Sequence, residues 1–549
     1  MKGNKTIINI VIVIVGLIVI NFIGDKFYKR FDLTQDHRYT MSDETKKIVD
    51  DIEDPIAIKV YLEGDFPAEF KRIQQETRQH LEELNALNKN INFRFINPKT
   101  KTKELIEKGL QPSRLSVQED GKVSQAVIFP WALITYKNKT EKVSLLSNST
   151  ANSQEEQLQN SIENLEYEFS NALSKITSKK DKKIAVIRGN GELEDIFLYS
   201  TLKKLGEYYR LAEFTLDSVN YSPQKTLKEL TKYDMAIIAK PTERFTEEEK
   251  FTLDQFVFNG GKTMWLIDKV HAEMDSLMLD GKMLAYNRDL NLTDQLFQYG
   301  VRINFNITKD LYSNTIRLAS GNVGDQTQFQ DFPWLYFPLV TSNNNNPIST
   351  NIDPVLLKFP SSIDTLKNGI KKTIILQSSI YAKPIGTPID VSLNEIAQKT
   401  SKESLNNGNQ IFGVLLEGTF KSAYADRVKP FQIPNSSLNN KPNKMIVISD
   451  GDIIANEVFR GEPIDLSKDK WTNRPYGNVD FLLNATQYLL EDSGILKLRS
   501  KNLQIQFLDK EKAFQERGFW QGINLILPMV ILFIFGLLFN FIRKKKYTS

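Results

Sequence analysis

Residues 183–206 read KIAVIRGNGELEDIFLYSTLKKLG, and this stretch decides the fold class. The apolar run at 184–187 predicts a buried strand, a glycine turn follows it, and the pattern at 195–206 predicts a helix. The alternation continues with a strand ending near Leu216, a strand at 235–239, a helix at 247–258 and a strand at 264–267. Strands separated by helices of this length predict a parallel, doubly wound α/β sheet. Such sheets bind ligands at the carboxyl ends of their strands.

The doubly wound pattern is interrupted downstream and then resumes. Residues from about 270 to 410 are rich in Asn, Pro and aromatic residues, which favours a β-rich insertion. Apolar runs at 411–417 and 445–449, and a helical pattern at 479–490, restore the α/β pattern. We therefore predict one α/β ectodomain over residues 183–508 that carries this insertion.

A second α/β layer is predicted upstream, over residues 25–147. Strand-like and helical patterns alternate there in the order β-α-β-α-β-β, with strand-like runs at 56–62, 91–96, 126–136 and 142–146. This order, followed by a helix, predicts a thioredoxin-like fold. The chain has no Cys-x-x-Cys motif, which excludes a redox role for it.

Residues 148–182 begin as a polar linker and continue as a helix. Apolar residues recur along it at steps of four and three, at Leu158, Ile162, Leu165, Phe169, Ala172 and Ile176. This face predicts either packing against a neighbouring domain or a coiled coil between subunits. The short repeat favours packing, because coiled coils usually sustain more heptads.

Two apolar stretches lie near the ends of the chain. Residues 7–23 read IINIVIVIVGLIVINFI and residues 523–542 read INLILPMVILFIFGLLFNFI, each close to the length that spans a bilayer as a helix. No small-x-small cleavage site follows the first stretch, so residues 1–24 are predicted to be an uncleaved anchor. Residues 509–522 are then a juxtamembrane segment, and residues 543–549 form a basic tail.

The cations beside the two stretches predict their orientation. Neither tip of the chain carries an acid, and the cations there are Lys2, Lys5, Arg543, Lys544, Lys545 and Lys546. Because positive flanks are retained in the cytoplasm, both termini are predicted to be cytoplasmic. Roughly 500 residues then lie beyond the membrane, enough for several domains.

Composition excludes several classes of function. The 549 residues include no cysteine and three histidines, which removes thiol nucleophiles and thiolate metal sites and leaves few candidates for a histidine base. The chain has 71 Lys and Arg against 67 Asp and Glu, a net charge of +4. The six cations at its tips account for more than this positive charge. The body between the tips is therefore not basic, and a nucleic-acid interface is not expected.

Residues 260–263, Gly-Gly-Lys-Thr, do not form a phosphate-binding loop. Such a loop requires a glycine where Phe256 stands and runs from strand to helix, whereas this segment is predicted to run from helix to strand. A glycine that ends the helix explains the pattern. No ATP site and no cofactor are expected.

Two turns at predicted strand ends supply candidate ligand or partner contacts. Gly189, Asn190, Gly191 and Glu192 combine backbone donors with a carboxylate, and Asp450 and Asp452 could offer oxygens to Mg²⁺ or Ca²⁺. Asp268, directly after the predicted strand 264–267, is a further candidate contact. In both cases a tight turn held by its own side chains is the favoured alternative, and no metal site is predicted. His271 lacks a serine in a G-x-S-x-G context that could complete a catalytic pair.

Nearly the whole chain resembles the GldG family, gliding-motility-associated subunits of bacterial ABC transporters. The resemblance rests on the N-terminal apolar stretch, on the C-terminal one and on the order of several segments between them. These are RFDLTQDHRYTMSDET at 30–45, DPIAIKVYLEGDFP at 54–67, IRGNGELED at 187–195, FPWLYFPLV at 332–340, FGVLLEGTFKSAYADR at 412–427, MIVISDGDIIANEV at 445–458 and YGNVDFLLNATQYLLEDSGILKLRSK at 476–501.

This resemblance implies a membrane-anchored accessory subunit that lies largely in the periplasm and is held in the inner membrane. Its implied partners are a separate permease subunit and a separate cytoplasmic ATPase subunit, in a complex needed for gliding. A substrate-binding role is the usual description of the family, but no substrate follows from the similarity. Two spans are too few for a permease, which agrees with an accessory role.

The α/β portion is also similar to class I glutamine-amidotransferase-like domains, whose sheet is flavodoxin-like. In that family the strand after a Gly-Gly turn ends at a nucleophilic cysteine, whereas here the corresponding strand, 264–267, runs into Asp268. The similarity therefore implies a fold used for binding.

The leading hypothesis is a non-enzymatic subunit that binds a permease and a periplasmic partner or cargo. An anchored hydrolase or metal-dependent enzyme using Asp450, Asp452 or Glu192, and a purely structural scaffold, are the alternatives.

Overall fold

The structure is a computed structural model of the chain. It describes residues 15–16, 40–64, 68–119, 122–146, 154–341, 346–398, 400–433, 441–490, 494–500, 512 and 515–547. The chain divides into two compact units, residues 1–501 and residues 502–549. The predicted first membrane span and the cations Lys2 and Lys5 lie outside the described residues.

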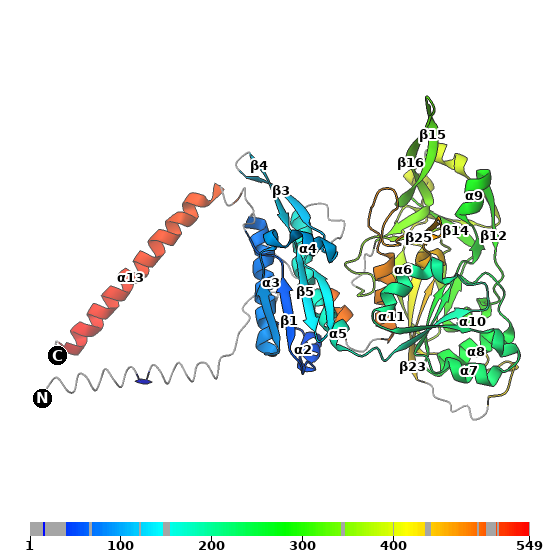
Figure 1. The fold of residues 1–549 in the computed structure, drawn as a ribbon, viewed down its shortest axis with the longest axis horizontal. Coiled ribbons are helices and arrows are strands. Elements are labelled where there is room, and N and C mark those ends of the chain that lie inside the picture. Colours follow the sequence, from blue (N-terminus) through cyan, green and yellow to red (C-terminus); the bar gives the residue numbers. More distant parts are fainter. Residues whose placement is uncertain are drawn as a thin grey trace. The chain divides into compact units, whose positions relative to one another are not determined.

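The first part of the larger unit is a four-stranded sheet with helices (Figure 1). Its strand order is β2-β1-β5-β6, with β2 parallel to β1 and the other pairs antiparallel. Its elements are α2 (Asp43–Asp50), β1 (Ile56–Val60), α3 (Ala68–Leu87), β2 (Ile91–Phe95), η1 (Pro98–Thr100), α4 (Thr102–Glu107), β3 (Ser113–Glu119), β4 (Lys122–Ile128), β5 (Trp131–Tyr136) and β6 (Lys139–Ser144).

The hairpin of β3 and β4 is absent from the sequence prediction. The strand expected at 126–136 is in fact two strands, because β4 ends at Ile128 and Pro130 precedes β5. Proline has no backbone N–H to donate to a ladder, which explains the break. A thioredoxin-like fold for this part stays a prediction.

Helix α5 (Gln154–Thr177) follows, and all six apolar residues of its predicted face are buried. Glu166, on the same helix, accepts hydrogen bonds from the backbone N–H of Ser42 (2.7 Å) and from the hydroxyl of Thr45 (2.8 Å). Both donors belong to the start of α2, so α5 packs within the larger unit. This arrangement favours packing on a neighbouring domain over a coiled coil between subunits.

A seven-stranded sheet forms the core of the rest of the unit, in the order β19-β22-β23-β10-β9-β7-β8. Five adjacent strands are parallel, and β22 runs antiparallel to both of its neighbours. The strands are β7 (Lys183–Arg188), β8 (Arg210–Thr215), β9 (Met235–Ala239), β10 (Lys262–Leu266), β19 (Lys371–Gln377), β22 (Ile411–Thr419) and β23 (Pro442–Ile448). If the five parallel strands are numbered along the chain, their spatial order across the sheet is 2-1-3-4-5, which is the flavodoxin-like order.

Helices cover both faces of this sheet because its central strands are apolar on both sides. One core cluster joins the sheet to α6 (Asp195–Gly206) and α11 (Asn478–Leu490), and a second joins the opposite face to α7 (Pro223–Leu230) and α8 (Glu247–Phe258). Trp265 of β10 is fully buried in the second cluster. The doubly wound arrangement predicted from residues 183–267 is therefore present.

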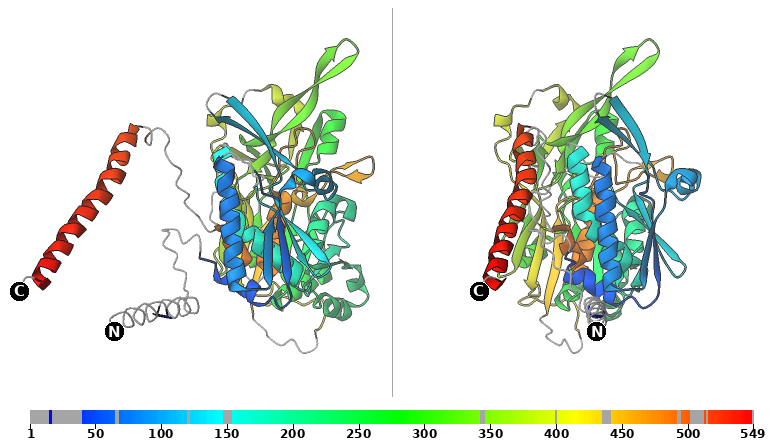
Figure 2. Two further views of the ribbon diagram at one scale, coloured as in Figure 1. Left: turned by 60° about the vertical axis from the view of Figure 1, so that its left-hand side comes forward. Right: turned by 90° about the vertical axis from the view of Figure 1, so that its left-hand side faces the viewer.

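The chain between β10 and β22 is β-rich, with two short helices. It contains β11 (Val270–His271), α9 (Met274–Asp280), β12 (Lys282–Asn287), α10 (Thr293–Tyr299), β13 (Val301–Ile303), β14 (Asn306–Asp310), β15 (Ser313–Val323), β16 (Gln326–Val340), β17 (Val355–Leu356), β18 (Ile363–Thr365), β20 (Ala382–Gly386), β21 (Ile389–Ser392), η3 (Leu393–Ala397) and η4 (Lys402–Ser404). The hairpin of β15 and β16 projects from it (Figure 1 and Figure 2).

Part of the range predicted to be an insertion belongs to the main sheet, because β19 pairs with β22 at the edge of that sheet. The separate core of the inserted part is aromatic and includes Trp334, Tyr336, Phe337 and Phe359. Short elements complete the unit, namely η2 (Asp217–Asn220), η5 (Asp452–Ile454), β24 (Val458–Phe459), β25 (Glu462–Pro463) and η6 (Ile495–Ser500).

The smaller unit contains the long helix α13 (Arg517–Tyr547), which includes the predicted second span. Within the part of the chain that the structure describes, it is the one helix long and apolar enough to cross a membrane, and none of it is buried in protein. Arg543, Lys544 and Lys545 lie exposed near its C-terminal end, and Lys546 belongs to the same helix. Such a helix fits a membrane anchor.

Candidate functional site at the carboxyl edge of the sheet

Four parallel strands bring the candidate residues to one edge of the main sheet. The Gly189–Glu192 turn follows β7, Lys240 follows β9, Asp268 lies two residues after β10, and Asp450 lies two residues after β23. Because parallel strands end on the same edge, residues far apart in sequence meet there. No described hydrogen bond or ion pair joins the turn after β7 to the aspartates.

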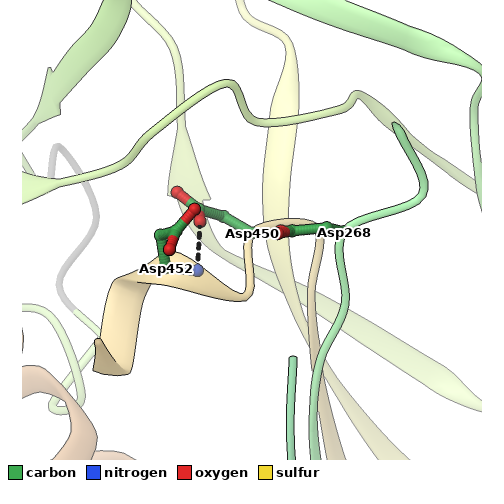
Figure 3. Close-up of side chains that lie close together, drawn as sticks. All are labelled: Asp268, Asp450 and Asp452. Carbon is green, nitrogen blue, oxygen red and sulfur yellow. Dashed lines mark hydrogen bonds between the residues drawn. The ribbon is translucent and has the colours of Figure 1, made fainter. Parts of the chain in front are cut away.

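Asp268, Asp450 and Asp452 form a cluster in which one carboxylate oxygen from each residue lies within 4.8 Å of the other two (Figure 3). The backbone N–H of Asp452 donates to Asp450 (2.7 Å), and the backbone N–H of Lys358 donates to the other oxygen of Asp450 (2.6 Å). Asp268 accepts from the backbone N–H of Gly451. The Asp450 turn is thus held by its own side chain, as the favoured interpretation of the sequence expected.

Lys240 is the residue of this cluster that the sequence prediction missed. Its ammonium lies 2.7 Å from Asp452, 3.0 Å from Glu273 and 3.5 Å from Asp268, with its side chain 7% exposed. Its backbone is left-handed, with φ of 55°. The sequence signal was available, because Lys240 directly follows a buried strand just as the aspartates closely follow theirs.

Gly451 makes room for Lys240. A Cβ added at Gly451 would lie 2.6 Å from Cγ of Lys240 and 2.7 Å from its Cβ, closer than such atoms approach. The glycine of the Asp-Gly-Asp turn is therefore required by contact with the lysine stem. It places the ammonium among the carboxylates.

Burial and charge together set the protonation of this cluster. Burial would lower the pKa of Lys240, but the carboxylates of Asp452, Asp268 and Glu273 outweigh it and raise the pKa, so the ammonium is retained. Burial raises the pKa of Asp268 to about 6, against the opposing effect of Lys240. Burial also holds the pKa of Asp450 well above its usual range, and the neighbouring Asp268 and Asp452 raise it further.

The three carboxylates are oxygen ligands of the kind that Mg²⁺ and Ca²⁺ prefer. The Lys240 ammonium, however, already lies within ion-pair distance of two of the three, Asp268 and Asp452. A divalent cation would have to displace this ammonium or be repelled by it. The geometry thus favours an internal ion-pair network over a metal centre.

The pKa of Asp268 predicts a pH dependence of stability. Its folded pKa of about 6 exceeds the usual 3.8, so between these values the folded chain binds more protons at this group than the unfolded chain. The stabilising contribution is therefore present below about pH 4 and is lost as the pH rises through about 6. Relative to Asp268→Asn, the wild-type free energy of unfolding should fall across this window in denaturant titrations. Parallel curves for the two proteins would contradict the assignment.

The turn after β7 contacts the loop that follows β9. The backbone carbonyl of Asn190 accepts from the N–H groups of Thr242 and Glu243, each at 2.9 Å, and its side chain donates to Glu249 (3.0 Å). Gly191 has φ of 68°, and a Cβ there would lie 2.1 Å from the hydroxyl oxygen of Thr242. These contacts fit a structural turn.

Two buried oxygens of this turn, Oδ1 of Asn190 and Oε1 of Glu192, lack a hydrogen-bond partner among the described atoms. The other oxygen of Glu192 accepts from the backbone N–H of Asn190 (2.8 Å). Burial raises the pKa of Glu192, which favours its neutral form. A ligand or partner contact at Gly189–Glu192 stays a proposal.

His271 is held locally. Its ring lies against that of Tyr286, with centroids 4.8 Å apart and the planes tilted by 38°. Nδ1 lies 3.0 Å from Arg288, which also pairs with Glu273. Burial, reinforced by Arg288, lowers the pKa of His271. The histidine therefore connects to the Lys240 network through Arg288 and Glu273, and it has no serine in a catalytic context.

The α/β region with this site matches a known family. Residues 181–485, more than half of the chain, match the family described as ABC-type uncharacterized transport system. The chain belongs to this family. As a member of the family, it has an accessory role in an ABC transport system. Residues 35–135 match a further domain of unknown function, DUF7088.

Two other comparisons describe its relatives. An uncharacterized protein of Borreliella burgdorferi is 21% identical over 530 residues, which cover 94% of each chain. A solved structure described as the mmIFT52 N-terminal domain is 11% identical, with a TM-score of 0.30, over 59% of this chain and all of that domain. Similarity at that TM-score has no bearing on the fold.

Proposed function

We propose that the chain is a non-enzymatic, membrane-anchored accessory subunit of an ABC transporter. The observation that carries the proposal is the family match, which spans the α/β region from β7 to α11. In this proposal α13 and the predicted first span bind the permease subunit in the inner membrane, and a separate ATPase subunit joins the complex from the cytoplasm. The α/β domains lie in the periplasm, where they engage a partner or cargo.

The chemistry of the site supports a role without catalysis. The three clustered carboxylates are engaged by Lys240 and by backbone N–H groups. The neighbouring hydroxyl, Ser449, is 1% exposed and donates to the backbone carbonyl of Ser361. A nucleophile needs access to substrate and a base to take its proton, whereas this hydroxyl is buried and donates to backbone carbonyls. The resemblance to the GldG family further suggests that the complex serves gliding motility.

Co-purification tests the assembly. Tagged wild-type chain extracted in mild detergent is expected to recover a permease and an ATPase in comparable amounts, identified by mass spectrometry. The matched control exchanges residues 517–545 for an unrelated single-span helix, which keeps an anchor but removes the surface of α13. This chimera should stay in the membrane and lose most of the permease. Recovery of neither subunit by the wild-type chain would refute the proposal.

A further inference from the structure

A cleft of about 600 Å³ opens at the carboxyl edge of the main sheet. Its floor includes Lys240 and Asp452, and its walls come from the inserted part, with Arg317 and Phe337, and from the segment after β23, with Trp471. The volume lies within the range of small-molecule sites. The cleft also lies where doubly wound sheets bind ligands.

Lys358 presents an incompletely paired ammonium to this cleft. Its side chain is 19% exposed, and its one hydrogen-bonding partner among the described residues is Glu457, at 3.3 Å. Glu457 is shared, because its other carboxylate oxygen accepts from Lys470. An ammonium has three donors, so two N–H groups of Lys358 are left for a ligand or for water.

Other N–H donors at the cleft also have no described hydrogen-bond acceptor. The guanidinium of Arg317 uses Nε and Nη2 for Asp331, which leaves Nη1 without a described partner. Trp471 is 55% exposed, its ring lies 5.1 Å from the Arg317 guanidinium, and its indole N–H has no described partner. These donors favour a ligand rich in hydrogen-bond acceptors.

Most carboxylates of the cleft are, by contrast, already engaged. Glu273 and Asp452 accept from Lys240, and Asp469 accepts from the backbone N–H of Trp471 (2.9 Å) and the hydroxyl of Tyr476 (2.9 Å). Asp465 accepts from Ser467. Asp275, exposed at the rim, is the lining carboxylate without a described partner. A cationic ligand would find fewer unused groups than an anionic one.

The walls between these polar groups are apolar. Phe337 lies below the Lys358 ammonium, with 5.8 Å from Nζ to the ring centroid, and the other apolar side chains include Met274, Met278, Leu356 and Phe359. Ligand sites typically combine such walls with a few polar groups that fix orientation. The cleft therefore suits a molecule with an anionic group and an apolar body.

We propose that this cleft binds an organic anion, with its carboxylate or phosphate group on the Lys358 ammonium and its apolar body against the Phe337 wall. This proposed ligand binding goes beyond the accessory role. Its test does not depend on assembly with a permease, because binding is measured on the purified chain alone.

Calorimetry on the full chain in mild detergent tests the ligand class with four probes of similar size. These are 3-phenylpropionate, phenyl phosphate, the neutral 3-phenylpropanamide and the cation phenethylammonium. At least one anion should bind about tenfold or more tightly than the amide, the size of one charge-assisted interaction. The two anions distinguish carboxylate from phosphate recognition. Equal binding of the amide, tighter binding of the cation, or no binding of either anion at about 10 mM would overturn the proposal.

Two variants with opposite expected effects test the role of Lys358. Lys358→Gln should weaken binding of the anion about tenfold, whereas Glu457→Gln should strengthen it several-fold, because it removes the competing carboxylate. Lys232→Gln, an exposed lysine paired with Glu229 on the surface, is the matched control and should change nothing. Thermal unfolding of each variant checks that it is folded. If Lys358→Gln does not fold, unchanged or weaker binding by Glu457→Gln overturns the assignment.

Discussion

Lys240→Met should lower the free energy of unfolding by about 3–5 kcal/mol, the usual cost of removing one partner from a buried ion pair. Methionine keeps the apolar stem but removes the ammonium that pairs with Asp452, Glu273 and Asp268. Glu273 keeps Arg288 as a partner, but Asp452 and Asp268 then face each other without the ammonium in a buried site. Denaturant titration followed by tryptophan fluorescence measures the change, since Trp265 and Trp334 are buried in two different cores.

Two comparisons separate this charge effect from loss of packing. Lys232→Met removes an exposed lysine and should change the free energy of unfolding by less than about 0.5 kcal/mol. Asp452→Asn combined with Lys240→Met removes one of the stranded charges and should recover part of the loss. The deficit of Lys240→Met should also shrink at acidic pH, because protonation removes the carboxylate charges. A deficit that is independent of pH would contradict the ion-pair explanation.

Asp254→Ala is expected to cost a similar amount, about 3–5 kcal/mol, for a different reason. This fully buried carboxylate on α8 accepts from the hydroxyl of Tyr299 (2.8 Å), the backbone N–H of Ala423 (2.7 Å) and the hydroxyl of Ser422. It therefore ties α8 to α10 and to the segment after β22. Alanine leaves the buried Tyr299 hydroxyl and Ala423 N–H without this acceptor, and each such group costs about 1–3 kcal/mol.

The Asp254 prediction has its own controls. Burial raises the pKa of Asp254, so the charge is not the main source of stability and Asp254→Asn, which keeps one acceptor oxygen, should cost much less than alanine. Asp426→Ala changes an exposed aspartate in the same segment and should be nearly neutral. Denaturant titrations measure all three variants. An alanine variant as stable as the asparagine variant would refute the acceptor role.

The sequence was a good guide wherever the pattern was local. Residues 183–206 fold as the predicted strand, glycine turn and helix, and the period of the apolar face identified the buried side of α5. The site aspartates could also be selected from the sequence, because each lies just after a buried apolar run. In all these cases the apolar pattern along a single segment is sufficient to predict the element or the position of the residue.

Long-range pairing could not be predicted in the same way. The edge strand β19 lies within a range expected to be an insertion, and the hairpin of β3 and β4 is polar enough to resemble a loop. Lys240 was missed because a lysine after a strand is usually solvated, and only its position beside three acids from other segments explains its burial. The strand that pairs with β19 and the acids that pair with Lys240 are both distant from them in sequence, so a local pattern does not identify them.

The sequence by itself determined the doubly wound sheet, the apolar C-terminal helix and the acids at the strand ends, since each depends on a repeat within a few turns or residues. Only the tertiary structure decided what those acids do. The parallel strands bring Asp268, Asp450 and Asp452 together, with the Lys240 ammonium beside Asp268 and Asp452. The inserted part and the segment after β23 add the other walls of a cleft that Lys240 and Asp452 line. Charge balance in a buried site depends on distances between segments, and the fold alone sets those distances.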